Sequence, residues 1–278
     1  MSQPNIDGLS EQQFLEHYDP NKYTHPSVAV DIVIFTIADV KEDNYRKLSK
    51  KGLRVLLIQR GNHPFMGQWA LPGGFVRPDE TVDEAANREL AEEAGINGGY
   101  LEQLYTFSKL ERDPRTRVIS CAHMALIDSD RLELKAGTDA EDAQWFTVSM
   151  EVQSERFNLS LINEETHLSA VVVLESGGTD LKIIENSGLA FDHAEIIVYA
   201  IRRLRSKLEY TDLAFDLMPE KFTLTELQQV YEVILGKPLF KAAFRRKVRD
   251  LVTETGEYRQ NAGHRPSQIF IAARRNKQ

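Results

Sequence analysis

Hydrophobic and polar positions divide the first 150 residues into short apolar segments with one amphipathic stretch among them. Runs rich in β-branched and other apolar residues predict strands, and they cover Val28–Ile37, Leu53–Arg60, Tyr100–Phe107, Arg117–Leu126 and Gln144–Val148. Thr81–Ala94 has a helical composition, and Gly95 follows it as a C-terminal stop signal. One helix inserted among several strands predicts a mixed α+β domain.

The pattern changes again in the second half of the chain. Leu168–Leu174 and Leu181–Ile184 flank Gly177-Gly178 and predict a hairpin. Phe191–Tyr210 returns to helical spacing, and Pro219 then marks a domain boundary.

Beyond Pro219 the order of elements is that of a small separate module. Thr223 and Glu226 form a capping box at the start of a predicted helix, Leu224–Leu235. The elements that follow are a turn at Gly236-Lys237-Pro238, a second helix over Phe240–Val252, a polar loop from Gly256 to Pro266 and a strand over Gln268–Ala272. Helix, turn, helix and hairpin predict a winged helix-turn-helix.

Charge supports this division. The 278 residues contain 34 Lys and Arg against 42 Asp and Glu, a net charge of −8, which by itself argues against a nucleic-acid partner. Residues 219–278, however, hold 12 basic and 6 acidic residues, a net charge of +6, which leaves −14 for the remainder. This asymmetry predicts two partners of different kinds.

Composition excludes several other classes of protein. Hydrophobic residues make up 42% and charged residues 27% of the chain, as in globular domains. A single cysteine, Cys121, excludes a disulfide framework and a cysteine-based zinc site. The polar N-terminus is not a signal peptide, and no apolar run approaches the ~20 residues of a membrane span. We therefore expect a cytoplasmic protein with no membrane partner.

Acidic residues gather in one segment, Gly74–Ile96, which reads GFVRPDETVDEAANRELAEEAGI. Glu89, Glu92 and Glu93 are spaced i, i+3 and i+4, so they are neighbours on one side of the predicted helix. Three adjacent carboxylates repel one another unless a cation lies between them, and Mg²⁺ prefers such oxygen ligands. The alternative is a solvated acidic helix face. The helical wheel weighs against it, because Glu89 and Glu93 fall beside the apolar stripe.

This segment resembles the Nudix signature, in which a glycine, a glutamate and the pattern REUxEExGU stand at fixed spacing. All the fixed positions are filled, by Gly74, Glu80, Arg88, Glu89, Leu90, Glu92, Glu93, Gly95 and Ile96. The resemblance implies an α/β/α sandwich with a mixed sheet and a ligand in which a nucleoside diphosphate is linked to another group. It implies Glu89, Glu92 and Glu93 as ligands of Mg²⁺. Glu92, Glu93 and Arg88 become candidate catalytic residues, with Glu80 in support.

The flanking segments GNHPFMGQWALPGGFV and ERDPRTRVIS resemble those of Nudix proteins that recognise ADP-ribose. The resemblance makes Arg112, Arg115 and Gly74 candidate ligand-binding residues. The alternative for each arginine is a surface position in a turn. His63 and Trp69 are further candidates, although Trp69 fits the core better. The other histidines considered, His25, His123 and His193, lack metal-ligand spacing and are interpreted as structural or surface residues.

Basic residues follow one face of the second helix of the C-terminal module. Lys241, Arg245 and Arg249 are spaced i, i+4 and i+8, rotated away from the apolar face, and Arg246 lies beside them. Such a face suits entry into the major groove of DNA. The loop that follows suits a wing that contacts phosphates or the minor groove, through Arg259, His264 and Arg265. The alternatives are a solvated basic helix and a module that binds a protein.

Taken together, these segments resemble the Nudix-related transcriptional regulators of NAD metabolism. The resemblance implies an N-terminal extension (1–26), a Nudix-like ligand-binding domain (27–210) and a winged-helix DNA-binding domain (211–278). Residues 151–188 depart from the compact family plan and are interpreted as an insertion in the Nudix-like domain. It implies a homodimeric regulator, most simply a repressor, that binds a palindromic operator on double-stranded DNA and senses ADP-ribose or a related sugar nucleotide. Members of this family often carry a degraded signature, whereas here it is intact. An active Mg²⁺-dependent ADP-ribose pyrophosphatase, with Glu141 or Asp142 as general base, is therefore the alternative.

Overall fold

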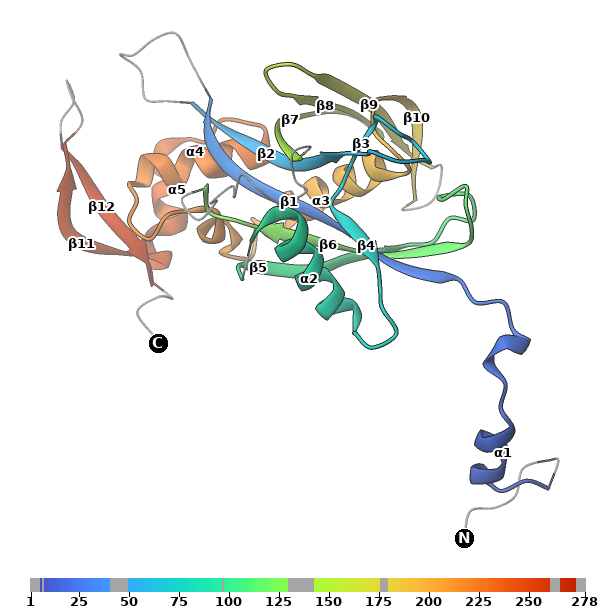
Figure 1. The fold of residues 1–278 in the computed structure, drawn as a ribbon. Coiled ribbons are helices and arrows are strands. Elements are labelled where there is room, and N and C mark those ends of the chain that lie inside the picture. The colour runs from blue at the N-terminus through green and yellow to red at the C-terminus, as the bar shows by residue number, and fades with distance from the viewer. Residues whose placement is uncertain are drawn as a thin grey trace.

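A single mixed sheet forms the larger part of the molecule (Figure 1). The computed structural model describes residues 6, 8–40, 50–96, 98–129, 143–175, 180–260 and 266–273. Within these ranges the sheet has 10 strands, ordered β10-β9-β8-β7-β2-β1-β6-β5, with β3 beside β2 and β4 beside β1. The strands are β1 (Ser27–Val40), β2 (Lys50–Gln59), β3 (Trp69–Ala70), β4 (Gly73–Phe75), β5 (Tyr100–Phe107), β6 (Val118–Leu126), β7 (Ala143–Gln153), β8 (Arg156–Ile162), β9 (His167–Leu174) and β10 (Leu181–Ser187).

Strand β1 separates two hydrophobic layers. Along β1, Val30, Ile32 and Ile34 pack with helix α2 (Val82–Ala94) on one face. Val33, Phe35 and Ile37 belong to the core that contains helix α3 (His193–Lys207) on the other face. This alternation follows from the two-residue period of a strand. Because β1 pairs in parallel with β6 and antiparallel with β2, the predicted α/β/α sandwich with a mixed sheet is confirmed.

Helix α2 begins and ends where its sequence predicts. The side chain of Thr81 accepts a hydrogen bond from the Glu84 amide, and Glu84 in turn accepts one from the Thr81 amide. Gly95 ends the helix with φ of 65°, a conformation that favours glycine. These two caps fix which residues of the acidic segment are helical.

Residues 151–187 extend the sheet. Strand β7 runs to Gln153, five residues beyond its predicted end, because it continues to pair with β8. The predicted hairpin is confirmed as the antiparallel pair β9 and β10, whereas its Gly177-Gly178 turn lies outside the described residues. Buried side chains of β8 and β9 pack in the same core as α3.

The C-terminal module has the predicted order of a winged helix. It comprises the 3-10 turn η4 (Leu213–Leu217), helices α4 (Leu224–Leu235) and α5 (Lys241–Val248), the 3-10 turn η5 (Arg249–Leu251) and strands β11 (Val252–Arg259) and β12 (Ser267–Ala272). The predicted extent of the second helix was wrong at its end. The helix stops at Val248 because Val252 pairs with Ala272 and opens β11, which also takes Gly256 to Arg259 out of the predicted loop.

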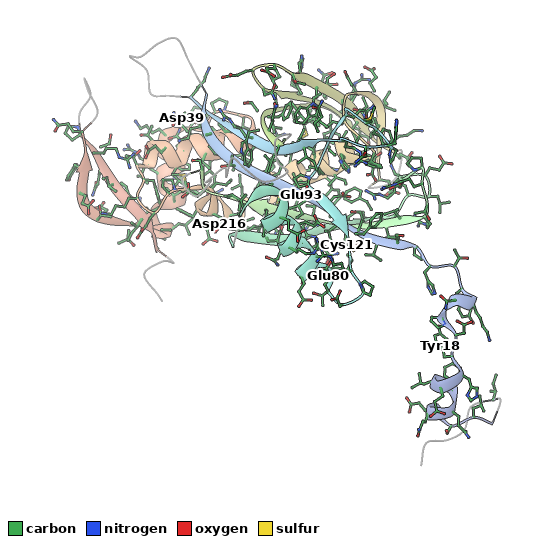
Figure 2. The ribbon with its side chains drawn as sticks, in the orientation of Figure 1. Tyr18, Asp39, Glu80, Glu93, Cys121 and Asp216 are labelled. Atoms are coloured by element: carbon green, nitrogen blue, oxygen red, sulfur yellow. The ribbon has the colours of Figure 1, made fainter. Side chains whose placement is uncertain are left out.

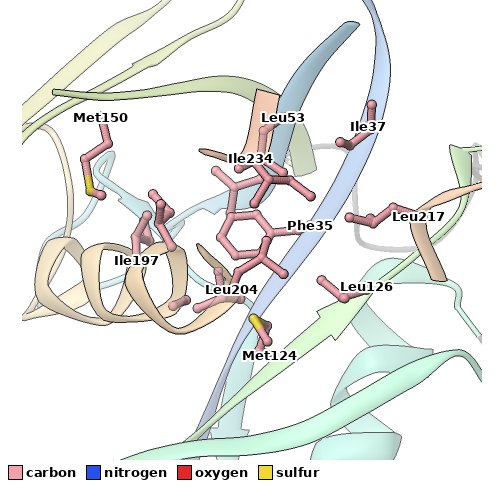
Figure 3. Close-up of a cluster of buried hydrophobic side chains, with 14 of the residues drawn as sticks. Phe35, Ile37, Leu53, Met124, Leu126, Met150, Ile197, Leu204, Leu217 and Ile234 are labelled. Atoms are coloured by element: carbon pink, nitrogen blue, oxygen red, sulfur yellow. The ribbon is translucent and has the colours of Figure 1, made fainter. Parts of the chain in front are cut away.

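One hydrophobic core joins the sheet to this module. Figure 3 shows Phe35 of β1 surrounded by Leu204 of α3, Ile234 of α4 and Leu217 of η4. The same cluster includes Phe244 of α5, which is buried. The two parts of the chain are therefore packed against each other rather than joined only by a linker.

The N-terminal segment lies away from the rest of the molecule (Figure 1). It contains helix α1 (Glu11–His17), in which no residue is buried, and the 3-10 turn η1 (Pro20–Lys22). Among the described residues, no helix combines the length and the apolar character that crossing a membrane requires.

Candidate functional site

Arg88 is the centre of the acidic segment. Its Nε and Nη2 donate to the two carboxylate oxygens of Glu80 at 2.9 and 2.7 Å, and its Nη1 donates to Glu89 at 2.6 Å and Glu92 at 3.1 Å. Hydrogen bonds from Arg88 lower the pKa of Glu80 to about 2, and those three carboxylates raise the pKa of Arg88. The predicted role of Arg88 in orienting carboxylates fits this geometry.

Glu93 differs from its neighbours because no cation of the described residues is paired with it. Its Oε2 is buried and has no hydrogen-bond partner among the described residues. Burial raises the pKa of Glu93 to about 7, and the nearby carboxylate of Glu89 adds to the rise. Figure 2 shows Glu93 on α2 and Glu80 ahead of that helix. Glu93 is thus the group whose charge is least compensated in this site.

Gly74 is required by close packing. A Cβ atom placed on Gly74 would lie 2.1 Å from Oε1 of Glu89, well inside contact distance. The backbone of β4 can approach the Glu89 carboxylate only because no side chain intervenes. This is a structural reason for the glycine, and its predicted contact with a ligand stays a prediction.

The carboxylate oxygens of the acidic segment are of the kind that a hard cation prefers, but their arrangement among the described residues does not form a metal site. The unpartnered oxygen of Glu93 beside Glu89 is the kind of site that a divalent cation would stabilise. Within the described ranges, however, no three Asp, Glu, His or Cys side chains converge in an arrangement that could hold a metal ion. Instead, Glu89 and Glu92 are paired with Arg88. The predicted Mg²⁺ site therefore stays a prediction.

Arg112 is held inside a buried ion-pair network. It donates two hydrogen bonds to Asp192, at 2.9 and 2.8 Å, and a third to Asp31 at 3.0 Å. Asp31 also accepts from Ser120 at 2.5 Å and faces Nε2 of His193 at 3.5 Å. Although burial alone would raise it, the pKa of Asp31 is held well below its usual range by His193, Arg112 and Ser120.

This network limits what Arg112 offers a ligand, since its Nε and Nη2 are already engaged. Sequence reasoning did not identify the two aspartates. The signal was present at Asp31, a charged residue in the apolar strand segment VAVDIVIF, because such a residue needs a buried partner. His193 has the predicted structural role, as its Nδ1 accepts the Leu71 amide at 2.8 Å.

Two further arginines lie against aromatic rings at the start of the acidic segment. We name this group the arginine–aromatic cluster; it consists of Arg60, Arg115, Phe75 and Phe191. The guanidinium of Arg60 lies 4.8 Å from the centre of the Phe191 ring, and that of Arg115 lies 5.9 Å from the same ring and 5.5 Å from Phe75. Arg115 also pairs with Asp113 at 2.8 Å. Burial and the neighbouring Arg115 lower the pKa of Arg60.

This cluster combines two cations with one carboxylate partner, so it carries an excess positive charge next to the acidic segment. The sequence identified Arg115 but not Arg60 or Phe191. Phe191 adopts a φ of 50°, a strained backbone for a phenylalanine that the sequence does not reveal. Trp69 is buried and packs on Phe146, as expected for a core residue, and the proposed bases Glu141 and Asp142 lie outside the described residues.

The basic face of α5 is open to solvent. Phe244 and Val248 are buried, whereas four of the predicted DNA-binding residues are exposed: Lys241, Arg245, Arg246 and Arg249. Arg259 lies at the end of the wing strand β11 and pairs with Glu226 at 2.6 Å, and its predicted contact with DNA stays a prediction. His264 and Arg265 lie outside the described residues. The second helix of the helix-turn-helix thus presents a cationic surface.

Comparison with known proteins supports both parts. Residues 45–161 match the NUDIX domain, and residues 214–271 match the NrtR DNA-binding winged helix domain. The chain is 34% identical to the ADPR responsive transcriptional repressor NtrR of Acinetobacter baylyi over 264 residues. The aligned residues cover 94% of this chain and 88% of that protein. The chain belongs to the NrtR family.

Two further proteins resemble this chain over different lengths. The crystal structure of Shewanella oneidensis NrtR complexed with a 27mer DNA has a TM-score of 0.62 and 31% identity, covering 88% of this chain and 93% of that one. The ADP-ribose pyrophosphatase of Methanocaldococcus jannaschii is 42% identical over 127 residues, which is 46% of this chain and 65% of that protein. The predicted family and fold of this chain are confirmed.

Proposed function

We propose that this protein is a transcriptional repressor that binds DNA through its winged helix and responds to ADP-ribose or a related sugar nucleotide. The observation that carries the proposal is the full-length likeness to an ADPR responsive repressor of the same two-domain order. The exposed cations of α5 agree with it, because helix-turn-helix proteins place such a face in the major groove.

The DNA-binding unit is a homodimer on a palindromic operator in this proposal. Two α5 helices related by a two-fold axis contact two half-sites about 34 Å apart. Lys241, Arg245, Arg246 and Arg249 supply phosphate and base contacts, and the wing with Arg259, His264 and Arg265 adds others. Light scattering on the purified protein tests the dimer directly, with twice the 31.7 kDa chain mass as the expected result.

The ligand lies between the acidic segment and the arginine–aromatic cluster. The excess positive charge of Arg60 and Arg115 suits a diphosphate, and the half-exposed ring of Phe75 offers a face on which a base or ribose can pack. Gly74 and Arg112 are further ligand-site residues in this proposal, Arg112 through the network that fixes its loop.

A gel shift with and without ADP-ribose tests the proposal. Fragments of upstream DNA from neighbouring genes, with genes of NAD metabolism first among them, are titrated with the protein. We expect retardation that weakens when ADP-ribose is added and with rising salt. Retardation of no fragment would overturn the repressor and would favour a module that binds a protein instead.

A second candidate is an active ADP-ribose pyrophosphatase, favoured by the complete set of signature carboxylates. Glu89, Glu92 and Glu93 would hold Mg²⁺, which would bind diphosphate oxygens and activate water. Arg88 would orient these carboxylates, as its hydrogen bonds to Glu89 and Glu92 suggest. AMP release with Mg²⁺ that is lost in Glu93→Gln supports this activity. Release unchanged in that variant would indicate a contaminating enzyme.

A further inference from the structure

Helix α3 and the residues that flank it contact both the loop between β5 and β6 and the DNA-binding module. We propose that α3 transmits the state of the ligand site to the winged helix, and that Arg205 and Lys247 are the positioning residues that make this coupling possible. The inference rests on the proposed function, since it assigns how ligand and DNA binding at those two sites affect each other.

The first turn of α3 holds the loop between β5 and β6. Glu195 pairs with Lys109 at 2.8 Å, and Asp192, the residue just before the helix, binds Arg112. Glu195 also accepts the Ile183 amide at 3.2 Å, which ties β10 to the same turn. This loop carries Arg115, whose guanidinium lies against Phe191 at the start of the helix. A ligand that moves Arg115 therefore acts on groups attached to the N-terminal end of α3.

The last turns of α3 hold the winged helix. Arg205 donates through Nε to the Ile234 carbonyl of α4 at 2.8 Å and through Nη2 to the Met150 carbonyl of β7 at 3.4 Å. Lys247 of α5 donates to the Leu208 carbonyl at 3.0 Å, directly after α3 ends. Its Nζ also lies 5.2 Å from the centre of the Tyr231 ring of α4. One side chain thus joins α3 to each helix of the DNA-binding module.

Between these ends α3 is closely packed. Its 15 residues span about 22 Å. Nine of them are buried, including Ile197, Ala200, Ile201 and Leu204 along the helix. Figure 3 shows Ile197 and Leu204 of this helix facing the same core as Ile234 of α4. Closely packed cores shift between discrete arrangements rather than deform smoothly, so a displacement at one end of α3 is passed to the other.

Arg205 fits its site closely. A Cβ atom on Gly236 would lie 2.9 Å from its Nη2, so the glycine that ends α4 leaves room for this guanidinium. Arg202, on the same helix, lies 5.1 Å from the ring of Phe157 in β8, on the sheet rather than on the module. Arg202 therefore offers a matched control for Arg205.

The experiment compares coupling factors. For each protein, DNA affinity is measured with and without saturating ADP-ribose, on a fragment that the wild type retards, and the ratio of the two affinities is the coupling factor. Allosteric ratios are typically about 5- to 150-fold. We expect Arg205→Lys and Lys247→Met to bring the ratio close to one, and Arg202→Lys to leave it unchanged. A ratio taken within one variant cancels any loss of DNA affinity that is independent of the ligand.

The outcomes separate the inference from the proposed function. ADP-ribose affinity in the absence of DNA should equal that of the wild type in both test variants, which a general folding defect would not allow. Wild-type coupling factors in both Arg205→Lys and Lys247→Met would overturn the role of α3 while leaving the repressor intact. If Arg205→Lys fails to fold, the exposed Lys247 decides the question. A wild type that binds DNA without any response to ADP-ribose would refute the proposed function and the inference together.

Discussion

At the residue scale, the carboxylates of this protein differ in whether an arginine is paired with them. Arg88 compensates Glu80, Glu89 and Glu92, and Arg112 compensates Asp31 and Asp192. Glu93 has no such partner among the described residues, and its pKa is raised to about 7. An uncompensated carboxylate next to compensated ones is the arrangement expected of a functional group.

Glu93 predicts a pH-dependent stability. Because its folded-state pKa of about 7 lies above the usual 4.5, the folded chain binds the proton more tightly than the unfolded chain. The stabilisation is complete below pH 4.5 and is lost as the pH rises through 7. From pH 5 to pH 8, the free energy of unfolding of the wild type, measured in urea, should fall by up to about 3 kcal/mol relative to that of Glu93→Gln.

The exposed neighbour Glu92 provides the control, as Glu92→Gln should reproduce most of the wild-type pH dependence. Adding Mg²⁺ at pH 8 should stabilise wild type but not Glu93→Gln if Glu93 is a metal ligand. A difference between wild type and Glu93→Gln that does not vary with pH would contradict the assignment.

Arg112 predicts a large loss of stability on substitution. Arg112→Met leaves the buried carboxylates of Asp31 and Asp192 without their cation, and removal of one partner from a buried pair costs about 3–5 kcal/mol. Lys221→Met removes an exposed pair with Glu257 and should cost no more than about 1 kcal/mol. Urea denaturation followed by circular dichroism measures both, and equal losses would contradict the buried network.

At the scale of elements, helix α5 divides its residues between two surfaces. Phe244 and Val248 anchor it in the core, and its cations face solvent. Lys247 departs from this division, since it reaches back to the end of α3. Outside α5, Arg259 of strand β11 is also engaged, because it pairs with Glu226 at the start of α4. The cations of the module therefore differ in what they are free to contact.

This division predicts the salt dependence of DNA binding. Arg245→Gln should lower the slope of log affinity against log salt by about one, because one phosphate contact is lost. Arg156→Gln, which removes a cation of β8 paired with Glu185, should leave the slope unchanged. Fluorescence anisotropy across a salt series measures the slopes. Identical slopes in all three proteins would place α5 outside the DNA interface.

At the scale of the molecule, the Nudix sheet and the winged helix share one hydrophobic core. Residues of β1, α3, α4 and α5 belong to a single buried cluster, and Figure 3 shows the part where three of these elements meet. Such continuity makes the two domains unfold together and gives a change in one a direct route to the other.

The shared core predicts a single unfolding transition in calorimetry. Ile234→Ala, a buried position on α4, should lower the free energy of unfolding by about 2–5 kcal/mol and move the whole transition to lower temperature. Equality of the calorimetric and van't Hoff enthalpies would confirm cooperativity. Two transitions, of which only the smaller moves in the variant, would show that the domains unfold independently.

The sequence by itself determined the elements and the chemistry that depends on local spacing. Caps at Thr81 and Gly95 set the helix that carries Glu89, Glu92 and Glu93, and a capping box at Thr223 set the start of α4. Local periodicity was sufficient for these because caps and helix faces involve residues within a few positions of one another.

Only the tertiary structure decided which distant residues meet. Arg112 met Asp31 and Asp192 about 80 residues away, and Arg60 met Phe191, pairings that no spacing in the sequence encodes. The second helix of the C-terminal module ends earlier than predicted because Val252 pairs with Ala272 in the β11–β12 hairpin. Long-range pairing depends on how the whole sheet and core close, so charge compensation and domain coupling became visible only in the folded chain.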